Sequence, residues 1–376
     1  MGQNVSEKAP KVQIFDYPLV IRIETAMADD RPIHLSGNFN GWQLGSADLI
    51  REEQADGSVQ FTIPAGRPVP VPLEYKFMKG DWAGEELDEY GLSVANRIWQ
   101  VGSATVHHHI PRWKNAGKAF QDQYLPVIEV LEEEFDIPQL IKTRRIAALL
   151  PYDYHQTDKH YPVLYLQDGQ NLFDDYAPFG SWEVDKRLAL MAERFTHEVI
   201  IIAIDHAEKD RISEFTPSYR TTIGAGDGKK YVRFLADHLK PYVDHRYRTL
   251  TDREHTGIGG SSMGALISIY AGLMYPEVYG KLMIFSPSLW VAPNIHFNAI
   301  RFEQPESSRI YLYAGGKESE NMVPNIRRFK EALEQKGHEG QMMEFKLAID
   351  PNGQHNEHRW GREFPRALEW LFYPDH

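Results

Sequence analysis

The apolar residues of this chain follow one pattern in its first third and another in the rest. Between residues 12 and 110, short runs rich in β-branched and aromatic residues alternate with turn pairs such as Asn-Gly and Asp-Gly. These runs are YPLVIRIET (17–25), PIHLSG (32–37), SVQFTIP (58–64), LEYKFM (73–78) and RIWQVG (97–102). The pattern predicts an all-β, immunoglobulin-like sandwich over residues 12–111. Residues 112–124 show no periodicity and are predicted to be a linker.

From about residue 125 onward, continuous apolar runs alternate with amphipathic stretches. The apolar runs are 162–167, 198–205, 255–260, 281–286, 309–315 and 343–349, and the helical stretches lie near 183–194, 228–244, 264–274, 321–336 and 361–372. This alternation is typical of a mostly parallel sheet with helices on both faces, and it predicts an α/β domain over residues 125–376. Active sites in such sheets lie at the carboxyl ends of the strands.

The composition excludes several classes of function. The 376 residues carry a net charge of −12, and we expect no nucleic-acid partner because neutralising phosphates requires a basic face. No apolar run approaches the ~20 residues that a membrane-spanning helix needs, so no membrane partner is expected. The absence of cysteine excludes a disulfide scaffold and a thiolate metal site. Histidines 107–109 would alternate between the faces of a strand, so at most two could converge, and we expect no metal or other cofactor.

The start of the chain shows no charged segment followed by an apolar one, which is the pattern of a signal peptide. A cytoplasmic location is therefore the default expectation. An exported protein given without its signal is the alternative, because its sequence would look the same.

A candidate nucleophile stands where a predicted strand meets a predicted helix. The segment Gly260-Ser261-Ser262-Met263-Gly264 has the form G-x-S-x-G in that context. The small residues around Ser262 let the backbone turn sharply, so that the hydroxyl projects above the sheet. The N-terminus of the helix offers amides to developing negative charge. Ser262 is therefore the predicted nucleophile.

A serine nucleophile needs a base and an acid, which we expect in the order acid and then histidine. Two glutamates, Glu318 and Glu320, follow the last-but-one predicted strand, and two histidines, His355 and His358, follow the last. His355 is the preferred base because His358 lies nearer the helix. Glu318 is the preferred acid because it is closer to the end of its strand, and Glu320 is its rival.

The chain from about 125 to 373 resembles the esterase D-like branch of the α/β-hydrolases, which includes enterochelin, feruloyl and acetyl-xylan esterases. The matching stretches include YPVLYLQDGQNLFDD (161–175), GIGGSSMGALIS (257–268), FSPSLW (285–290) and GQHNEHRWGREFPRALEWLF (353–372). The resemblance implies an α/β-hydrolase fold and the triad just described. It also implies that the oxyanion is bound by the amides of Met263 and Gln170.

The first domain resembles the glycogen- and starch-binding β-sandwich modules in LSGNFNGWQ (35–43), EYKF (74–77), GDW (80–82) and ANRIWQV (95–101). The resemblance implies that Trp42 and Trp82 stack on sugar rings while Lys76 and Asn96 bond the hydroxyls. Indole faces suit the apolar C–H faces of sugars. The alternative is that Trp42 fills the core of the sandwich and the module only packs.

The leading hypothesis is a serine carboxylic-ester hydrolase that acts on acetyl or feruloyl esters of carbohydrates, with possible α-glucan binding by the first domain. One alternative is a siderophore-ester hydrolase, and another is a non-catalytic glycan-binding protein with a hydrolase fold. Catecholate siderophores are anionic and favour a basic pocket. This chain is acidic, and its pocket candidates Trp182, Trp290 and Trp360 are aromatic, which favours the carbohydrate ester.

Overall fold

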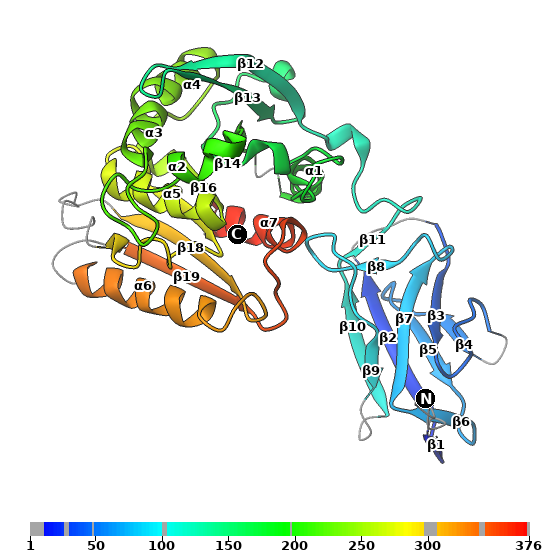
Figure 1. Ribbon diagram of the computed structural model, residues 1–376. Coiled ribbons are helices and arrows are strands. Elements are labelled where there is room, and N and C mark those ends of the chain that lie inside the picture. The colour runs from blue at the N-terminus through cyan, green and yellow to red at the C-terminus, as the bar shows by residue number, and fades with distance from the viewer. Residues whose placement is uncertain are drawn as a thin grey trace, which may run out of the picture. The chain divides into compact units, whose positions relative to one another are not determined.

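The computed structural model describes residues 11–25, 30–46, 49–99, 104–195, 198–296, 307–337 and 343–373. The chain forms two compact units, Met1–Gln121 and Asp122–His376. Figure 1 shows the strands and helices of each unit. None of the helices in the described ranges is both long and apolar enough to cross a bilayer.

The described part of the N-terminal unit consists of strands around an apolar core. The strands are β1 (Lys11–Ile14), β2 (Leu19–Thr25), β3 (Ile33–Gly37), β4 (Ile50–Glu53), β5 (Val59–Ile63), β6 (Pro68–Val71), β7 (Leu73–Lys79), β8 (Glu86–Leu87), β9 (Arg97–Trp99), β10 (Thr105–Ile110) and β11 (Arg112–Trp113). A four-stranded sheet has the order β10-β2-β5-β4, and a three-stranded sheet has the order β3-β7-β9. Alternate residues of β2 and β5 are buried, and residues of β3, β7 and β9 join them in one core.

Two short strand pairs, β1-β6 and β8-β11, accompany these sheets. The second pair includes the first two residues of the segment 112–124, which the sequence predicts to be a linker. Because β11 pairs with β8, residues 112–113 are hydrogen-bonded to the N-terminal unit.

The C-terminal unit is built on one eight-stranded sheet. Its strands are β12 (Val127–Ile137), β13 (Lys142–Leu150), β14 (Val163–Gln167), β15 (Ile200–Ile204), β16 (Thr256–Ser261), β17 (Lys281–Phe285), β18 (Ser308–Gly315) and β19 (Met343–Asp350). They lie in the order β12-β13-β15-β14-β16-β17-β18-β19. The β12-β13 and β13-β15 pairs are antiparallel and the others are parallel, so the sheet is mixed. Each of the predicted apolar runs forms one of the strands from β14 to β19.

Helices cover both faces of this sheet (Figure 1). They are α1 (Val184–Phe195), α2 (Arg211–Glu214), α3 (Gly228–Phe234), α4 (Lys240–Arg246), α5 (Ser262–Met274), α6 (Met322–Gly337) and α7 (Glu357–Phe372). Residues of α3, α5 and α6 share one apolar core, and residues of α1 and α7 share a second one with the opposite sides of the strands. The helix predicted over 228–244 is interrupted, because a π-helical turn, Leu235–Leu239, lies between α3 and α4.

The parallel strands place polar side chains at one edge of the sheet. Asp168 follows β14, Ser262 follows β16 and Ser286 follows β17, while Glu318 and His355 come shortly after β18 and β19. Because the carboxyl ends of parallel strands lie at the same edge, segments that are far apart in the sequence meet there.

Candidate active site

Ser262 occupies a sharp turn between a buried strand and a buried helix. It is the first residue of α5, directly after β16, and its backbone has φ 56, a conformation that is uncommon for a residue with a side chain. A Cβ on Gly264 would lie 2.8 Å from Asp168 Oδ2, and one on Gly260 would lie 3.0 Å from the carbonyl carbon of Gly264. A side chain at either glycine of the motif would therefore crowd its neighbours, and one at Gly264 would displace the Asp168 carboxylate.

The loops after β18 and β19 bring a carboxylate and an imidazole together. His355 Nδ1 lies 2.7 Å from Glu318 Oε2, and the Glu318 side chain is 1% exposed. The two loops are joined by backbone hydrogen bonds, since the Lys317 amide donates to the Gly353 carbonyl and the Gly316 amide to that of Asp350. The contact between His355 and Glu318 is thus fixed by the backbone as well as by the side chains.

The alternative acid and base lie elsewhere. Glu320 is exposed beyond Glu318, and His358 is exposed on the first turn of α7. Partial desolvation, together with the nearby guanidinium groups of Arg362 and Arg187, lowers the pKa of His358. Of the two glutamates and the two histidines that the sequence offers, the structure thus places Glu318 and His355 in contact.

A pocket of about 880 Å³ opens at this edge of the sheet, and Ser262, His355 and Gln170 line it together. The hydroxyl of Ser262 lies 3.3 Å from that of Ser288, which is longer than the usual separation of about 2.7 Å between hydrogen-bonded hydroxyl oxygens. Met263, which the resemblance implies as an oxyanion donor, is the second residue of α5. Gln170, the other implied donor, lies in a short 3-10 turn, Gly169–Asn171, after β14.

The segment around Gln170 is held from two sides. The Gln170 side-chain amide donates to the His206 carbonyl at 3.0 Å, and its oxygen accepts from the His206 amide at 2.8 Å. Two residues before it, Asp168 has φ 60 and accepts two hydrogen bonds of 2.7 Å from the Arg211 guanidinium. These contacts fix the backbone that carries the Gln170 amide.

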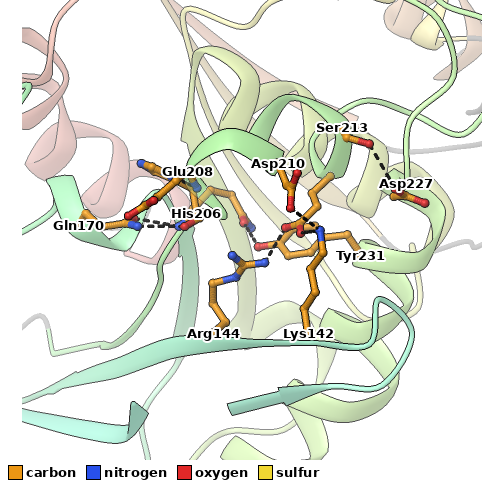
Figure 2. Close-up of polar contacts among 11 residues, drawn as sticks. Lys142, Arg144, Gln170, His206, Glu208, Asp210, Ser213, Asp227 and Tyr231 are labelled. Atoms are coloured by element: carbon orange, nitrogen blue, oxygen red, sulfur yellow. Dashed lines mark hydrogen bonds and ion pairs between the residues drawn. The ribbon is translucent and has the colours of Figure 1, made fainter. Parts of the chain in front are cut away.

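The segment that carries Arg211, residues 210–214, is anchored to the sheet. Figure 2 shows Lys142 and Arg144 reaching from β13 towards α2. Both cations pair with the buried Glu214 of α2, at 3.1 Å and 2.6 Å, and Lys142 also pairs with Asp210 at 2.9 Å. The short helix α2, which lacks the length to be stable alone, is thereby held in place.

Acidic and neutral groups dominate the described lining of the pocket. Arg211 is paired with Asp168, whereas Glu208 and Glu357 add negative charge. Burial raises the pKa of Glu357 and lowers the pKa of His206. The His206 Nδ1 accepts from the Glu208 amide at 2.9 Å, so the neutral ring carries its proton on Nε2.

The three tryptophans predicted for the pocket lie in different places. Trp360 lines the pocket, whereas Trp182 is 2% exposed and stacks on Phe285 in the core. Trp290 is 59% exposed and does not belong to the lining of this pocket. The positions predicted for Trp182 and Trp290 therefore differ from the observed ones. The sequence shows the ring but not whether it turns towards the core, the pocket or solvent.

The predicted sugar contacts of the N-terminal unit lie on its strands and loops. Trp82 is 50% exposed, Trp42 is half-buried and Asn96 is exposed. The Lys76 ammonium pairs with the carboxylate of Glu85. Trp42 is not part of the apolar core, which instead contains Trp99 and Trp113.

A sequence model of the family described as "Putative esterase" matches residues 138–371. The chain belongs to this esterase family. The uncharacterized protein YbbA of Bacillus subtilis (strain 168) is 26% identical over 246 residues, which are 61% of this chain and 92% of YbbA. The iron(III) salmochelin esterase of Escherichia coli O6:H1 is 26% identical over 164 residues, 37% of this chain and 40% of that protein. The crystal structure of the BES protein from Bacillus cereus matches with a TM-score of 0.53 and 20% identity, over 65% of this chain and 95% of that one.

In this esterase, several residues that lie around the pocket have no role predicted from the sequence. Ser286 and Ser288 stand in the stretch FSPSLW directly after β17, and His206 and Glu357 also lie near strand ends. A polar residue just beyond a parallel strand is a signal that could have drawn attention to them. Their contacts, by contrast, depend on how the loops fold.

Proposed function

We propose that this esterase is a serine carboxylic-ester hydrolase in which Ser262 is acylated and His355 is the general base. Glu318 holds the imidazole and stabilises its protonated form. The observation that carries the proposal is the 2.7 Å contact between His355 and Glu318 at the pocket that Ser262 also lines.

The proposed reaction has two steps. His355 takes the proton of Ser262 while the serine oxygen attacks the ester carbonyl, and the amides of Met263 and Gln170 bind the oxyanion. The C–O bond to the alcohol breaks, and the alcohol leaves with the proton from His355. Water, deprotonated by His355, then attacks the acyl-enzyme. The bond between the acyl carbon and the Ser262 oxygen breaks, the serine takes the proton back from His355, and the carboxylic acid is released. The reaction requires no metal or cofactor.

We propose a neutral acyl ester of a carbohydrate as the substrate, with acetyl or feruloyl as the acyl group. Phe179 and Ile212, 71% and 48% exposed, present apolar surface at the pocket. A second, more open depression of about 530 Å³ shares Gln170, His206 and Glu208 with the pocket. Its charged residues of both signs offer donors and acceptors to a polyhydroxyl alcohol, which supports a sugar at this side.

A siderophore ester is the second candidate, because the iron(III) salmochelin esterase is a relative. Ferric catecholate complexes are anionic, however, and Glu208 and Glu357 would repel them. Arg211 offers little compensation because its guanidinium is paired with Asp168. The charges thus favour the neutral substrate.

The charge selectivity is tested with two aryl esters of nearly equal size, one ending in a carboxylate and the other in the corresponding neutral primary carboxamide. We expect kcat/KM to be roughly 5- to 30-fold higher for the neutral ester, because two carboxylates in the pocket oppose the anion. The double variant Glu208→Gln, Glu357→Gln is expected to narrow this ratio. Glu331→Gln, which removes an exposed charge on α6, serves as the matched control and should leave the ratio unchanged.

The substrate class is tested in parallel with acetylated and feruloylated oligosaccharides beside a trilactone siderophore. Faster hydrolysis of the siderophore would contradict the carbohydrate assignment. An anionic ester that is preferred to its neutral partner would contradict the proposed basis of selectivity.

We also propose that the N-terminal unit binds α-glucan through Trp42 and Trp82. The exposed ring area of Trp82 supports this proposal. The double variant Trp42→Ala, Trp82→Ala is expected to lose retention on an α-glucan affinity gel and to keep its activity on a small aryl ester. Ile98→Ala, which removes another exposed apolar side chain of this unit, is the control. Equal retention of wild type and double variant, or no retention of wild type, would leave the unit a packing role.

A further inference from the structure

Ser286 lies at the carboxyl end of β17 in a strained and buried position. Its backbone has φ 48, and the residue is 0% exposed. The Ser286 amide donates to the Tyr313 carbonyl at 2.8 Å, which ties the turn to the neighbouring strand β18. Left-handed backbone at a residue with a side chain costs free energy and is often found at functional sites.

The hydrogen bonds around Ser286 have a defined direction. The indole nitrogen of Trp360 donates to Ser286 Oγ at 2.9 Å, and Ser286 Oγ lies 2.6 Å from Glu318 Oε1. An indole N–H can only donate, and a serine hydroxyl carries one proton. The hydroxyl proton therefore goes to Glu318, so Ser286 connects a buried tryptophan to the carboxylate that contacts His355.

The two carboxylate oxygens of Glu318 are thus used differently. Oε1 accepts from the Ser286 hydroxyl and from the Gly315 amide at 2.7 Å, and Oε2 faces His355 Nδ1. The indole of Trp360 also meets the ring of His355 edge to face, at 4.9 Å between centroids. One buried network therefore touches both the acid and the base.

A glutamate needs such support more than an aspartate would. Its side chain has an additional rotatable bond, and the torsion that turns the carboxylate has a broad energy minimum. The Gly315 amide provides one hydrogen bond to Oε1, and a second donor to the same oxygen restricts the rotation of the carboxylate further. Ser286 supplies that donor from a different strand.

We propose that Ser286 is a positioning residue that acts through Glu318 and sets the rotation of its carboxylate towards His355. This inference rests on the proposed triad. It goes beyond that triad by assigning to the turn after β17 the task of orienting the acid. A network of this kind keeps reacting groups close to their productive geometry.

The test is a double-mutant cycle between Ser286 and Glu318, followed through kcat on an uncharged fluorogenic ester. Ser286→Ala is expected to lower kcat roughly 10-fold, because a hydrogen bond to a charged group is lost. KM should change little, since the hydroxyl contacts Glu318. In a Glu318→Ala background, the same substitution should change kcat by less than about twofold, because the group through which Ser286 acts is gone.

Two further variants separate positioning from a general effect on folding. Ser308→Ala removes a buried hydroxyl from the other end of β18, where it accepts from Arg253 Nη2 at 2.9 Å, and should leave kcat unchanged. Ser286→Cys keeps a weak donor and should give a kcat between those of wild type and Ser286→Ala. Thermal unfolding is measured for each variant, and Ser286→Cys replaces Ser286→Ala in the cycle if the alanine variant does not fold.

An equal loss of kcat in both backgrounds would overturn the inference, and so would a change in KM alone. Wild-type activity of Glu318→Ala would instead contradict the triad itself. The failure of the inference and the failure of the proposed function therefore give different results.

Discussion

Replacement of Ser262 by alanine is expected to lower kcat for an aryl ester by roughly 10⁴- to 10⁶-fold, the range found when a nucleophilic serine is removed. The variant should fold, because alanine in the same backbone conformation, with φ 56, has the same Cβ as serine. The measurement compares the kcat of purified wild type and variant and includes their unfolding temperatures. Activity within about tenfold of wild type would contradict the assignment of the nucleophile.

Covalent labelling provides an independent test of the same residue. An organophosphonate is expected to add one adduct to wild type and none to Ser262→Ala. The neighbouring Ser261 is the matched control, since it also lines the pocket but ends the strand instead of beginning the helix. Ser261→Ala should still take up the label, and a label lost from that variant would move the nucleophile to Ser261.

Strands buried on both faces were predictable because their apolar runs are continuous. The five strands from β14 to β18 are of this kind at their centres, whereas β19, at the edge of the sheet, is only partly buried. The sequence locates each of the six within about two residues. The hairpin of β12 and β13 was not predicted. Its first strand exposes a run of glutamates. Register shifts at Val130/Glu132 and Glu132/Phe135 also break the two-residue alternation of buried and exposed positions. The sequence of an edge strand with bulges thus lacks the period by which strands are recognised.

The residues that follow strand ends were predictable for the same topological reason. Parallel strands place Ser262, Glu318 and His355 at one edge of the sheet, so their order and spacing were enough to bring them together. The environment of the rings was not predictable. Trp182 and Trp360 lie 6.2 Å apart between ring centroids, yet only Trp360 reaches the pocket. Contacts of that kind depend on three-dimensional packing, which one sequence without a structure does not determine.

The acid of the proposed triad can be tested by comparing two glutamates of the same loop. We expect Glu318→Ala to lower kcat by roughly 10³- to 10⁴-fold, because the imidazole loses the group that orients it and stabilises its positive charge. Glu320→Ala, which removes an equal charge two positions further along the same loop, should stay within about twofold of wild type. Both are measured as kcat on the same aryl ester.

The pair of variants distinguishes three arrangements of the site. A larger loss in Glu320→Ala would mean that the loop after β18 rearranges so that Glu320 reaches His355. Mild effects in both variants would indicate a serine–histidine dyad, with His355 held by backbone contacts and by the edge of Trp360. We expect neither, because Glu318 is buried against His355 and accepts hydrogen bonds from the Ser286 hydroxyl and the Gly315 amide as well. Replacing Glu318 by alanine removes the contacts of its carboxylate with three partners. Replacing the exposed Glu320 removes a charge that is solvated by water.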